Sequence, residues 1–373
     1  MNDLTSQLIA LSNEIGGNTE YSRAGGGNAS VKLDGILHIK PSGVPLATLR
    51  AEELIPLRID VLLDALHSDE EVEGDPVRVA AQRAQVGDGG GRRPSVEILF
   101  HALIPDALVL HLHPLTANAL TCNEKGRELA ERILGDDAVW VDYTDPGIPL
   151  ARAVEEARTF FTERTGLPAP GITLLGNHGI IASGASYEEV AERVATLTGK
   201  IRAAIDAAPE PAPTKGSTSG APRAREIADR VRAALGATDC AFSTAGLAAE
   251  ASSPASGPVT RGPLIPDQIV YAGSLPLVLT GDEDDDALRK LVEGFVRSHG
   301  RHPIIAVVPN TLVVATGDSP SGAQNALDTF LDALRVARDA DRIGRLRVMD
   351  ERERHFIENW EAEAYRRSVA KEG

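Results

Sequence analysis

The chain has 373 residues, of which 42% are hydrophobic and 25% charged, a composition typical of a soluble globular protein long enough for two domains. Its 38 basic and 54 acidic side chains give a formal net charge of -16, which repels nucleic-acid phosphates and anionic lipid. We therefore expect no nucleic-acid and no membrane partner. An anionic small substrate would need a local pocket of backbone N–H groups, lysines or arginines.

The cysteines and the N-terminus favour a cytoplasmic location. Cys122 and Cys240 are far apart and in no metal-binding or redox spacing, which predicts two reduced thiols. The N-terminal residues contain no basic segment followed by a long apolar core, and no uncharged apolar run of about 18 residues occurs. We expect a cytoplasmic protein.

The first predicted elements are a helix and a hairpin. Apolar residues recur at helical spacing from Leu4 to Ile15, and two glycines follow. Residues 29–43, ASVKLDGILHIKPSG, alternate and turn at Asp34–Gly35, which is a strong hairpin signal. The run AGGGN lies immediately before and at the start of this hairpin.

The next stretch is predicted to be a mobile segment followed by a helix. Residues 67–93 are charged and glycine-rich, which indicates a mobile surface segment. Pro94 suits the first turn of a helix, and the apolar run VEILFHALI then continues it.

Strands follow this helix. Residues 107–114, ALVLHLHP, predict one strand, and residues 138–143, AVWVDY, predict a second that ends at a DPG turn. Residues 172–184, ITLLGNHGIIASG, predict two short strands joined by a Gly-Asn-His-Gly corner. The periodicity of residues 187–205 predicts an amphipathic helix.

A compositional change predicts the domain boundary. Residues 208–224 are rich in Pro, Ser, Thr and Gly and begin without periodicity, so we predict a linker between domains at 1–207 and 225–373. The second domain is predicted to be α/β. Its signals are IVYA, PLVLTG, a helix from Asp284 to about Ser298, a strand pair at 304–317, and helices from Ser321 and Met349.

Three histidines are candidate metal ligands. On a strand, residues two apart point to the same side, so His111 and His113 can reach one point at the distance of about 2.0 to 2.1 Å that zinc requires. Such a pair alone is more often an ordinary packing and hydrogen-bonding feature. His178 lies in the glycine-flanked corner, where the backbone can approach another element closely. Three protein ligands with one open position are typical of a catalytic metal site.

Glu97 is a candidate acid/base. It is the one carboxylate in the apolar run from Val96 to Ile104, so partial burial and a raised proton affinity are expected. A carboxylate beside a metal can be a fourth ligand and, once substrate displaces it, an acid/base. His101, four residues later on the same helix face, is interpreted as a supporting or structural residue.

Six motifs in order resemble the class II aldolase/adducin family: GGGNAS, KPSG, PSVE, HLHP, YTDPG and GNHG. The resemblance covers about residues 4–206 and implies a central β-sheet flanked by helices, here followed by a smaller C-terminal α/β domain. AGGGN, PSVE and GPLIPDQIVYAG are most similar to the aldolase part of bifunctional rhamnulose-1-phosphate aldolase/dehydrogenases.

The resemblance also implies roles for residues. It places zinc, or another divalent metal, on His111, His113 and His178, with Glu97 as acid/base and further ligand. The phosphate-binding positions that it implies are Asn28, Ser42, Gly43 and Ser95. Gly27, in the glycine run before them, is included in the same candidate site.

The implied activity is zinc-dependent cleavage of a ketose 1-phosphate, such as rhamnulose 1-phosphate, into dihydroxyacetone phosphate and an aldehyde through a metal-stabilised enediolate. The resemblance further implies a homo-oligomer with its site near a subunit interface. A smaller set of hydroxyl donors is expected for the phosphate, because Val96 stands where some family aldolases have a second serine. Lys40, Arg92 or Arg93 could compensate.

Alternatives remain at this stage. The same site could catalyse sugar-phosphate epimerisation or the decarboxylation of a keto acid phosphate. Alternatively, the domain could be a non-catalytic interaction module, as in adducin. A dinucleotide loop is disfavoured, because AGGGNAS leads into a hairpin and not into a helix N-terminus. The C-terminal domain offers no catalytic cluster, and we expect it to cover the active site or to form an oligomer interface.

Overall fold

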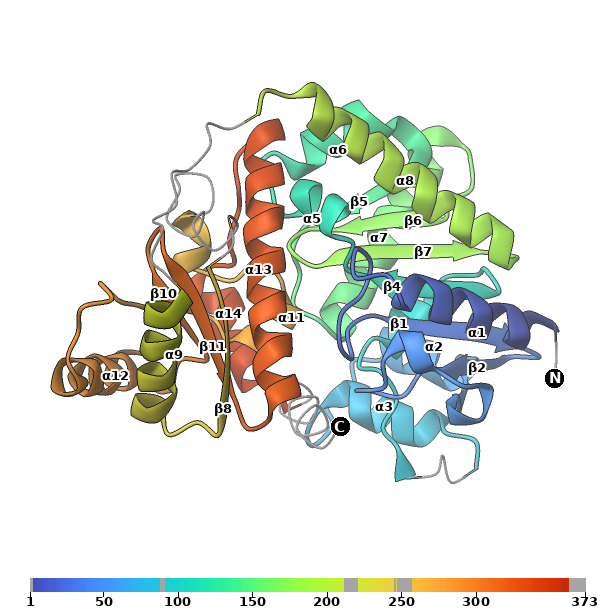
Figure 1. Ribbon diagram of the computed structural model, residues 1–373. Helices are drawn as coiled ribbons and strands as arrows, with labels where there is room; N and C mark the ends of the chain where they lie inside the picture. Colours follow the sequence, from blue (N-terminus) through green and yellow to red (C-terminus); the bar gives the residue numbers. More distant parts are fainter. Residues whose placement is uncertain (1–2, 88–90, 211–220, 245, 247–256, 362–373) are drawn as a thin grey trace. The chain divides into compact units, whose positions relative to one another are not determined.

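The computed structural model describes residues 3–87, 91–210, 221–244, 246 and 257–361 (Figure 1). Its chain divides into two compact units. Unit 1 contains Met1–Thr121 and Lys125–Ala204, and unit 2 contains Cys122–Glu124 and Ile205–Gly373. The division into two folding domains, at residues 1–207 and 225–373, stays a prediction. Most of the expected linker, residues 211–220, lies outside the described residues, and helix α9 already begins at Ala221.

Unit 1 contains a seven-stranded sheet with the order β3-β2-β1-β4-β7-β6-β5. Neighbouring strands are antiparallel, except that β5 and β6 are parallel. The strands are β1 (Asn28–Leu33), β2 (Ile36–Ile39), β3 (Ile55–Arg58), β4 (Leu108–Leu112), β5 (Val139–Val141), β6 (Ile172–Leu175) and β7 (Gly179–Gly184).

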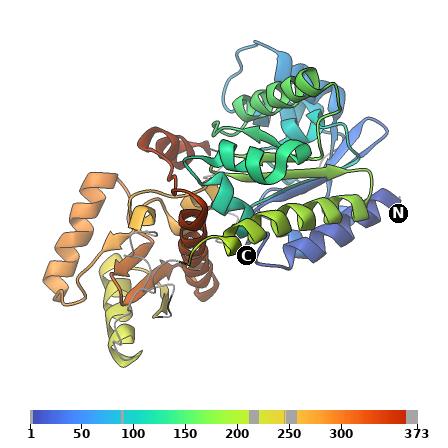
Figure 2. The same ribbon diagram turned by 90° about the horizontal axis from the view of Figure 1, so that it is seen from above.

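Helices cover both faces of this sheet. Helices α1 and α8 lie on one face, and α2 and α7 on the other (Figure 2). The helices of the unit are α1 (Asp3–Gly16), α2 (Ile59–His67), α3 (Pro76–Ala84), α4 (Ile98–Leu103), α5 (Leu115–Thr121), α6 (Gly126–Leu134), α7 (Ile148–Thr165) and α8 (Tyr187–Ala207). Buried aliphatic side chains of α2, α3, α4 and α7 pack on β2, β3 and β4 in one core. The predicted α/β class, a sheet flanked by helices, is confirmed.

The hairpin of β1 and β2 turns where the sequence predicts. Leu33 pairs with Ile36, and the two residues between them, Asp34 and Gly35, have positive φ values of 50° and 80°. Two residues with positive φ match the twist of the flanking strands, and Asp-Gly adopts them readily. The turn fixes the register of β1 on β2, and β1 pairs along its other edge with β4, where Asn28 lies opposite His111.

Two local predictions are wrong. Residues 67–93 are not simply a surface segment, because α3 lies within them and buries Val77, Ala80 and Ala84 in the core. Asp75 begins this helix by accepting a hydrogen bond from the Val77 amide over 2.8 Å. Residues 88–90, also within the expected mobile segment, lie outside the described residues.

The second wrong prediction concerns the start of the next helix. Helix α4 begins at Ile98 and not near Pro94, which instead forms a bridge with Pro41. The Ser95 hydroxyl accepts a hydrogen bond from the Glu97 amide over 3.3 Å, which favours a turn before the helix. Glu97 is therefore the residue that precedes the first helical residue.

Unit 2 is a second α/β unit, as predicted. Its four-stranded sheet has the order β8-β11-β10-β9. One core forms between α9, α12 and the sheet side that carries Val308, Leu312 and Val314. The elements are α9 (Ala221–Leu235), β8 (Asp239–Ser243), α11 (Pro266–Ala272), β9 (Leu277–Val278), α12 (Asp285–His299), β10 (Ile305–Val308), β11 (Leu312–Gly317), α13 (Pro320–Ile343) and α14 (Glu351–Asn359).

Among the described residues, no helix combines the length and apolar character that crossing a membrane requires.

Candidate metal centre

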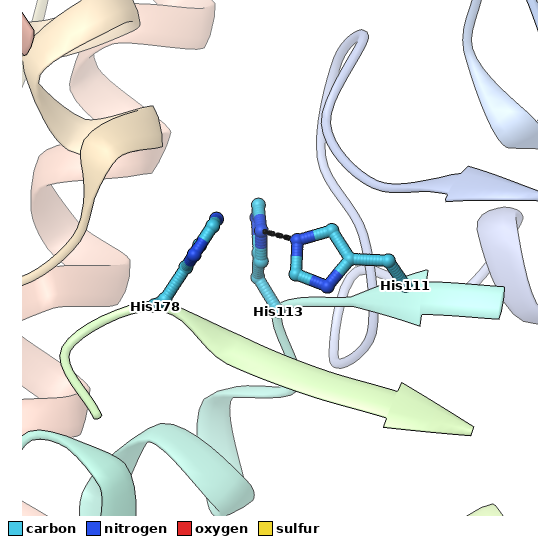
Figure 3. A group of neighbouring side chains, drawn as sticks. All are labelled: His111, His113 and His178. Carbon is cyan, nitrogen blue, oxygen red and sulfur yellow. Dashed lines mark hydrogen bonds between the residues drawn. The ribbon is translucent and has the colours of Figure 1, made fainter. Parts of the chain in front are cut away.

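Strand order brings three histidines to one end of the unit 1 sheet. His111 is the residue before the last of β4, His113 follows that strand, and His178 comes directly before β7 (Figure 3). Because β4 and β7 are antiparallel neighbours, with Leu112 opposite Ile180, the end of one lies beside the start of the other. The predicted convergence of the three histidines is therefore present.

The spacing of the ring nitrogens suits a metal ion. One nitrogen from each of the three imidazoles lies within 4.8 Å of the other two, and the His111 and His113 Nε2 atoms are 2.9 Å apart. Tetrahedral ligands at zinc–nitrogen distances of about 2.0 to 2.1 Å lie roughly 3.3 Å from each other. The three side chains fit a divalent metal with a small adjustment.

The tautomer of His111 is also suited to binding a metal ion. Its Nδ1 lies 2.9 Å from the backbone carbonyl oxygen of Ile180, which can only accept, so Nδ1 carries the hydrogen and Nε2 offers a lone pair. Burial lowers the pKa of His111 well below its ordinary value, and the neighbouring His113 and His178 lower it further. A neutral imidazole is the form that binds a metal.

Two glycines allow the backbones to approach this closely. A Cβ on Gly179 would lie 2.3 Å from the Leu112 carbonyl oxygen and 2.6 Å from the His113 ring. Gly27 has a φ of +70°, and a Cβ there would lie 2.8 Å from the His111 carbonyl oxygen. Gly27, predicted as a phosphate-site residue, thus packs directly on the histidine strand.

Glu97 reaches the histidines from the start of α4. Its Oε1 lies 3.3 Å from His178 Nε2 and its Oε2 lies 3.5 Å from His111 Nε2, while only 7% of the residue is exposed. The predicted burial is confirmed. A carboxylate held against a metal site can ligate the metal or move a proton beside it.

Asn28 joins this carboxylate. Its Nδ2 donates a hydrogen bond to Glu97 Oε2 over 2.6 Å, and its Oδ1 contacts His101 Nε2. His101 Nδ1 in turn lies 2.7 Å from the Ser30 hydroxyl. The interpretation of His101 as a supporting residue agrees with this geometry. Sequence reasoning missed Ser30, although its place two residues after Asn28 on a strand puts both on one face.

The other residues predicted to bind phosphate, Ser42, Gly43 and Ser95, lie on two loops that pair with each other. The Ser42 amide donates to the Arg93 carbonyl oxygen over 2.9 Å, so the KPSG turn pairs with the loop that carries Ser95. Gly43 has a φ of +84°. Their role in binding phosphate stays a prediction.

Lys40 holds these loops together. Only 1% of Lys40 is exposed, and its Nζ donates to the carbonyl oxygens of Val44 at 2.6 Å, Pro41 at 3.3 Å and Gly25 at 3.5 Å. Lys40 therefore links the glycine run to the KPSG turn. Arg92, another of the cations expected to compensate, pairs with Glu53 over 2.9 Å.

A curated protein is similar to this chain along almost its whole length. Among curated proteins, "Uncharacterized oxidoreductase YuxG" of Bacillus subtilis (strain 168) is 22% identical over 410 residues. The alignment covers 98% of this chain and 58% of that protein, so the chain spans less than two thirds of its relative. A match to a protein named as an oxidoreductase is consistent with the resemblance to bifunctional aldolase/dehydrogenases.

Solved structures include similar domains. The N-terminal class II aldolase domain of a conserved Thermoplasma acidophilum protein is 23% identical with a TM-score of 0.47, covering 54% of this chain and 94% of that one. L-fuculose-1-phosphate aldolase from Thermus thermophilus is 18% identical with a TM-score of 0.36, covering 54% of this chain and 91% of that one.

The family comparison covers more than half of the chain. Residues 6–205 match the family described as "Class II Aldolase and Adducin N-terminal domain", which agrees with the predicted extent of about 4–206. The matched region contains all three histidines, Glu97 and the loops around Lys40. The chain belongs to the class II aldolase and adducin N-terminal domain family.

Proposed function

We propose that the protein is a metal-dependent lyase that cleaves a ketose 1-phosphate, for example a deoxy-sugar phosphate, into dihydroxyacetone phosphate and an aldehyde. The observation that carries this proposal is the convergence of three imidazoles with one buried carboxylate, Glu97, at 3.3 to 3.5 Å from two of them. An interaction module has no need of this arrangement. Family membership supports the aldolase class, and rhamnulose 1-phosphate and fuculose 1-phosphate are the first substrates to test.

His111, His113 and His178 would hold the metal, with zinc the first candidate. When bound, a divalent metal supplies a Lewis acid that polarises the ketose carbonyl and stabilises the enediolate. Glu97 would carry the proton to or from C3, the carbon whose bond to C4 breaks, because its carboxylate lies against the histidines in a water-poor site. The electron pair of the broken bond stays on the C2–C3 fragment, and C4 becomes the aldehyde carbon as its hydroxyl group releases its proton to solvent.

The phosphate would bind at the adjoining loops that carry Gly27, Ser42, Gly43 and Ser95. Gly27 and Gly43 have positive φ, a conformation in which backbone N–H groups can line an anion site. Lys40 gives this region a positive charge within a chain of net charge -16. We further propose a homo-oligomer in which residues 225–373 contribute to the subunit interface or cover the site. Sedimentation and activity of a variant without residues 225–373 test that role, which is wrong if both are unchanged.

A substrate panel tests the reaction class. The zinc-loaded protein is incubated with several ketose 1-phosphates, pentulose 5-phosphates and keto acid phosphates, and products are followed by a coupled assay for dihydroxyacetone phosphate and by NMR. Release of dihydroxyacetone phosphate with an aldehyde supports the proposal. Epimerised pentulose phosphate or carbon dioxide without any aldehyde would contradict it in favour of the two alternative reactions on the same site.

A further inference from the structure

A chain of buried polar groups extends from Glu97 into the protein. Asn28 Nδ2 donates to Glu97 Oε2 over 2.6 Å, Asn28 Oδ1 contacts His101 Nε2, and His101 Nδ1 lies 2.7 Å from the Ser30 hydroxyl. His101 and Ser30 are fully buried and Asn28 is 4% exposed. None of the three is among the three metal-binding candidates, and His101 and Ser30 lie on the far side of Asn28 from Glu97.

The chemistry of the groups gives this chain one direction. An ionised carboxylate only accepts, so the Asn28 amide must turn its NH2 group to Glu97 and its oxygen to His101. That oxygen also only accepts, so His101 Nε2 must carry a hydrogen. His101 Nδ1 then accepts from the Ser30 hydroxyl, which is the remaining donor. Every bond points towards the carboxylate.

Packing supports a neutral His101 in this tautomer. Burial lowers the pKa of His101 well below its ordinary value, with smaller contributions from the charges of Lys32 and Lys40. The Phe100 ring stacks on the imidazole with ring centroids 5.0 Å apart. A neutral imidazole has one donor and one acceptor nitrogen, which is the pair that the chain requires.

We propose that His101 and Ser30 are positioning residues that lock the Asn28 amide, so that Asn28 holds the Glu97 carboxylate in its place beside the histidines. The role of Asn28 is then to orient the acid/base as well as, or instead of, binding phosphate. This proposal rests on the proposed function for its catalytic consequence. Its structural content, the fixed tautomer and amide orientation, is independent of any substrate.

The first test is the tautomer. The protein is labelled with 15N-histidine, and the ring nitrogens are observed by NMR at pH 7.5 without substrate. The resonances of His101 are assigned by their absence in His101→Gln, one of nine histidines being removed. The proposal expects a neutral ring protonated at Nε2. A ring protonated at Nδ1, or at both nitrogens, would overturn it.

The second test compares two amides of similar size at position 101. The amide nitrogen of Gln can take the place of Nε2 and donate to Asn28, whereas the amide nitrogen of Asn lies near the place of Nδ1. We expect His101→Gln to retain kcat within about threefold. His101→Asn should lower kcat by about tenfold or more, because the Asn28 amide is no longer held towards Glu97, with KM for the ketose phosphate nearly unchanged.

The outcomes are distinguishable. If both variants lose kcat equally and unfold at equally lower temperatures, His101 is only structural and the proposal is wrong. If KM for phosphate-bearing substrate rises while kcat stays the same in both, the chain serves phosphate binding and the proposal is also wrong. If the wild-type protein cleaves no ketose phosphate, the proposed function fails, and the NMR result still decides whether Asn28 is locked.

Discussion

Asn28 and Glu97 are 69 residues apart in the sequence, and the Asn28 amide nitrogen lies 2.6 Å from the Glu97 carboxylate. The register of β1 on β4 places Asn28 opposite His111, and the turn at Ser95 places Glu97 at the start of α4. The contact therefore joins the glycine run, the histidine strand and the acid/base candidate in one buried site.

Replacing Glu97 should remove catalysis and leave the protein folded. In Glu97→Gln the amide keeps the shape of the side chain and cannot carry the proton, so we expect kcat to fall by about 10² to 10⁴. Bound zinc should stay near one ion per chain, because three imidazoles remain. Steady-state kinetics and metal analysis check this, with the exposed Glu163→Gln as a control that retains activity. Activity within threefold of wild type would exclude Glu97 as the acid/base.

Metal removal should be reversible and should destabilise unit 1. A ligand that binds only the folded state contributes about 2.7 kcal/mol at a free concentration 100 times its Kd. Dialysis against a chelator should therefore lower the thermal unfolding temperature, and added zinc should restore it. His113→Ala should show no such response to zinc. An equal response in the variant would place the metal elsewhere.

Two glycine substitutions form a matched pair. A Cβ at position 179 would lie 2.3 Å from the Leu112 carbonyl oxygen. Gly179→Ala should therefore move the corner that carries His178 away from β4 and weaken zinc binding by about tenfold or more. A Cβ at Gly199, in α8, meets nothing within 4 Å, and Gly199→Ala should stabilise by up to about 1 kcal/mol. Zinc titration and urea unfolding of both variants check this. Equal zinc affinities would show that the corner tolerates a side chain.

Lys40 should be essential to the loops that surround the proposed phosphate site. Its Nζ donates to three backbone carbonyl oxygens in a fully buried position. Lys40→Met would leave these acceptors unmatched, which costs about 1 to 3 kcal/mol for each one that water cannot reach. We expect a loss of about 3 kcal/mol in urea unfolding, against less than about 0.5 kcal/mol for the exposed Lys125→Met. Equal stabilities would contradict this role.

Lys32 gives a prediction for pH. Burial lowers its pKa from 10.5 to about 7, and Asp106 offsets part of that shift. Between pH 7 and pH 10.5 the unfolded state binds more protons than the folded state, so the Lys32 contribution to stability rises with pH. Below pH 7 Lys32 is protonated in both the folded and the unfolded state, and the full free-energy cost of burying its charge lowers the stability. Lys32→Met should therefore gain stability over wild type at pH 6, on the order of 2 kcal/mol after allowing for solvent screening, and less at pH 10. A difference independent of pH would refute the shift.

Local patterns predicted much of the fold. The Asp34–Gly35 turn, the strand with His111 and the corner with His178 each follow from residues next to one another. The helix at 76–84 was harder to predict from the sequence. Its neighbouring residues are charged and rich in glycine, and its apolar face is largely alanine. The start of α4 was predicted too early, because Pro94 is compatible with both a first helical turn and the bridge that it forms with Pro41.

The candidate site was predictable as a set of residues but not as a network. The histidine spacing indicates a metal, whereas the contacts of Asn28 with Glu97 and His101 depend on strand register and on the packing of α4. Lys40 could be read as a phosphate ligand from its motif. Its three carbonyl partners depend on how two loops fold over it, which no short pattern specifies.

The central claim, that the three histidines and Glu97 form a metal-dependent aldol site, has a direct test that needs no knowledge of the aldehyde. Zinc-loaded protein is mixed with dihydroxyacetone phosphate in D2O, and the C3 proton signals are followed by NMR. We predict exchange of a C3 proton by the wild-type protein and none by Glu97→Gln or His113→Ala. Full zinc occupancy of the wild-type protein without any exchange would contradict the claim.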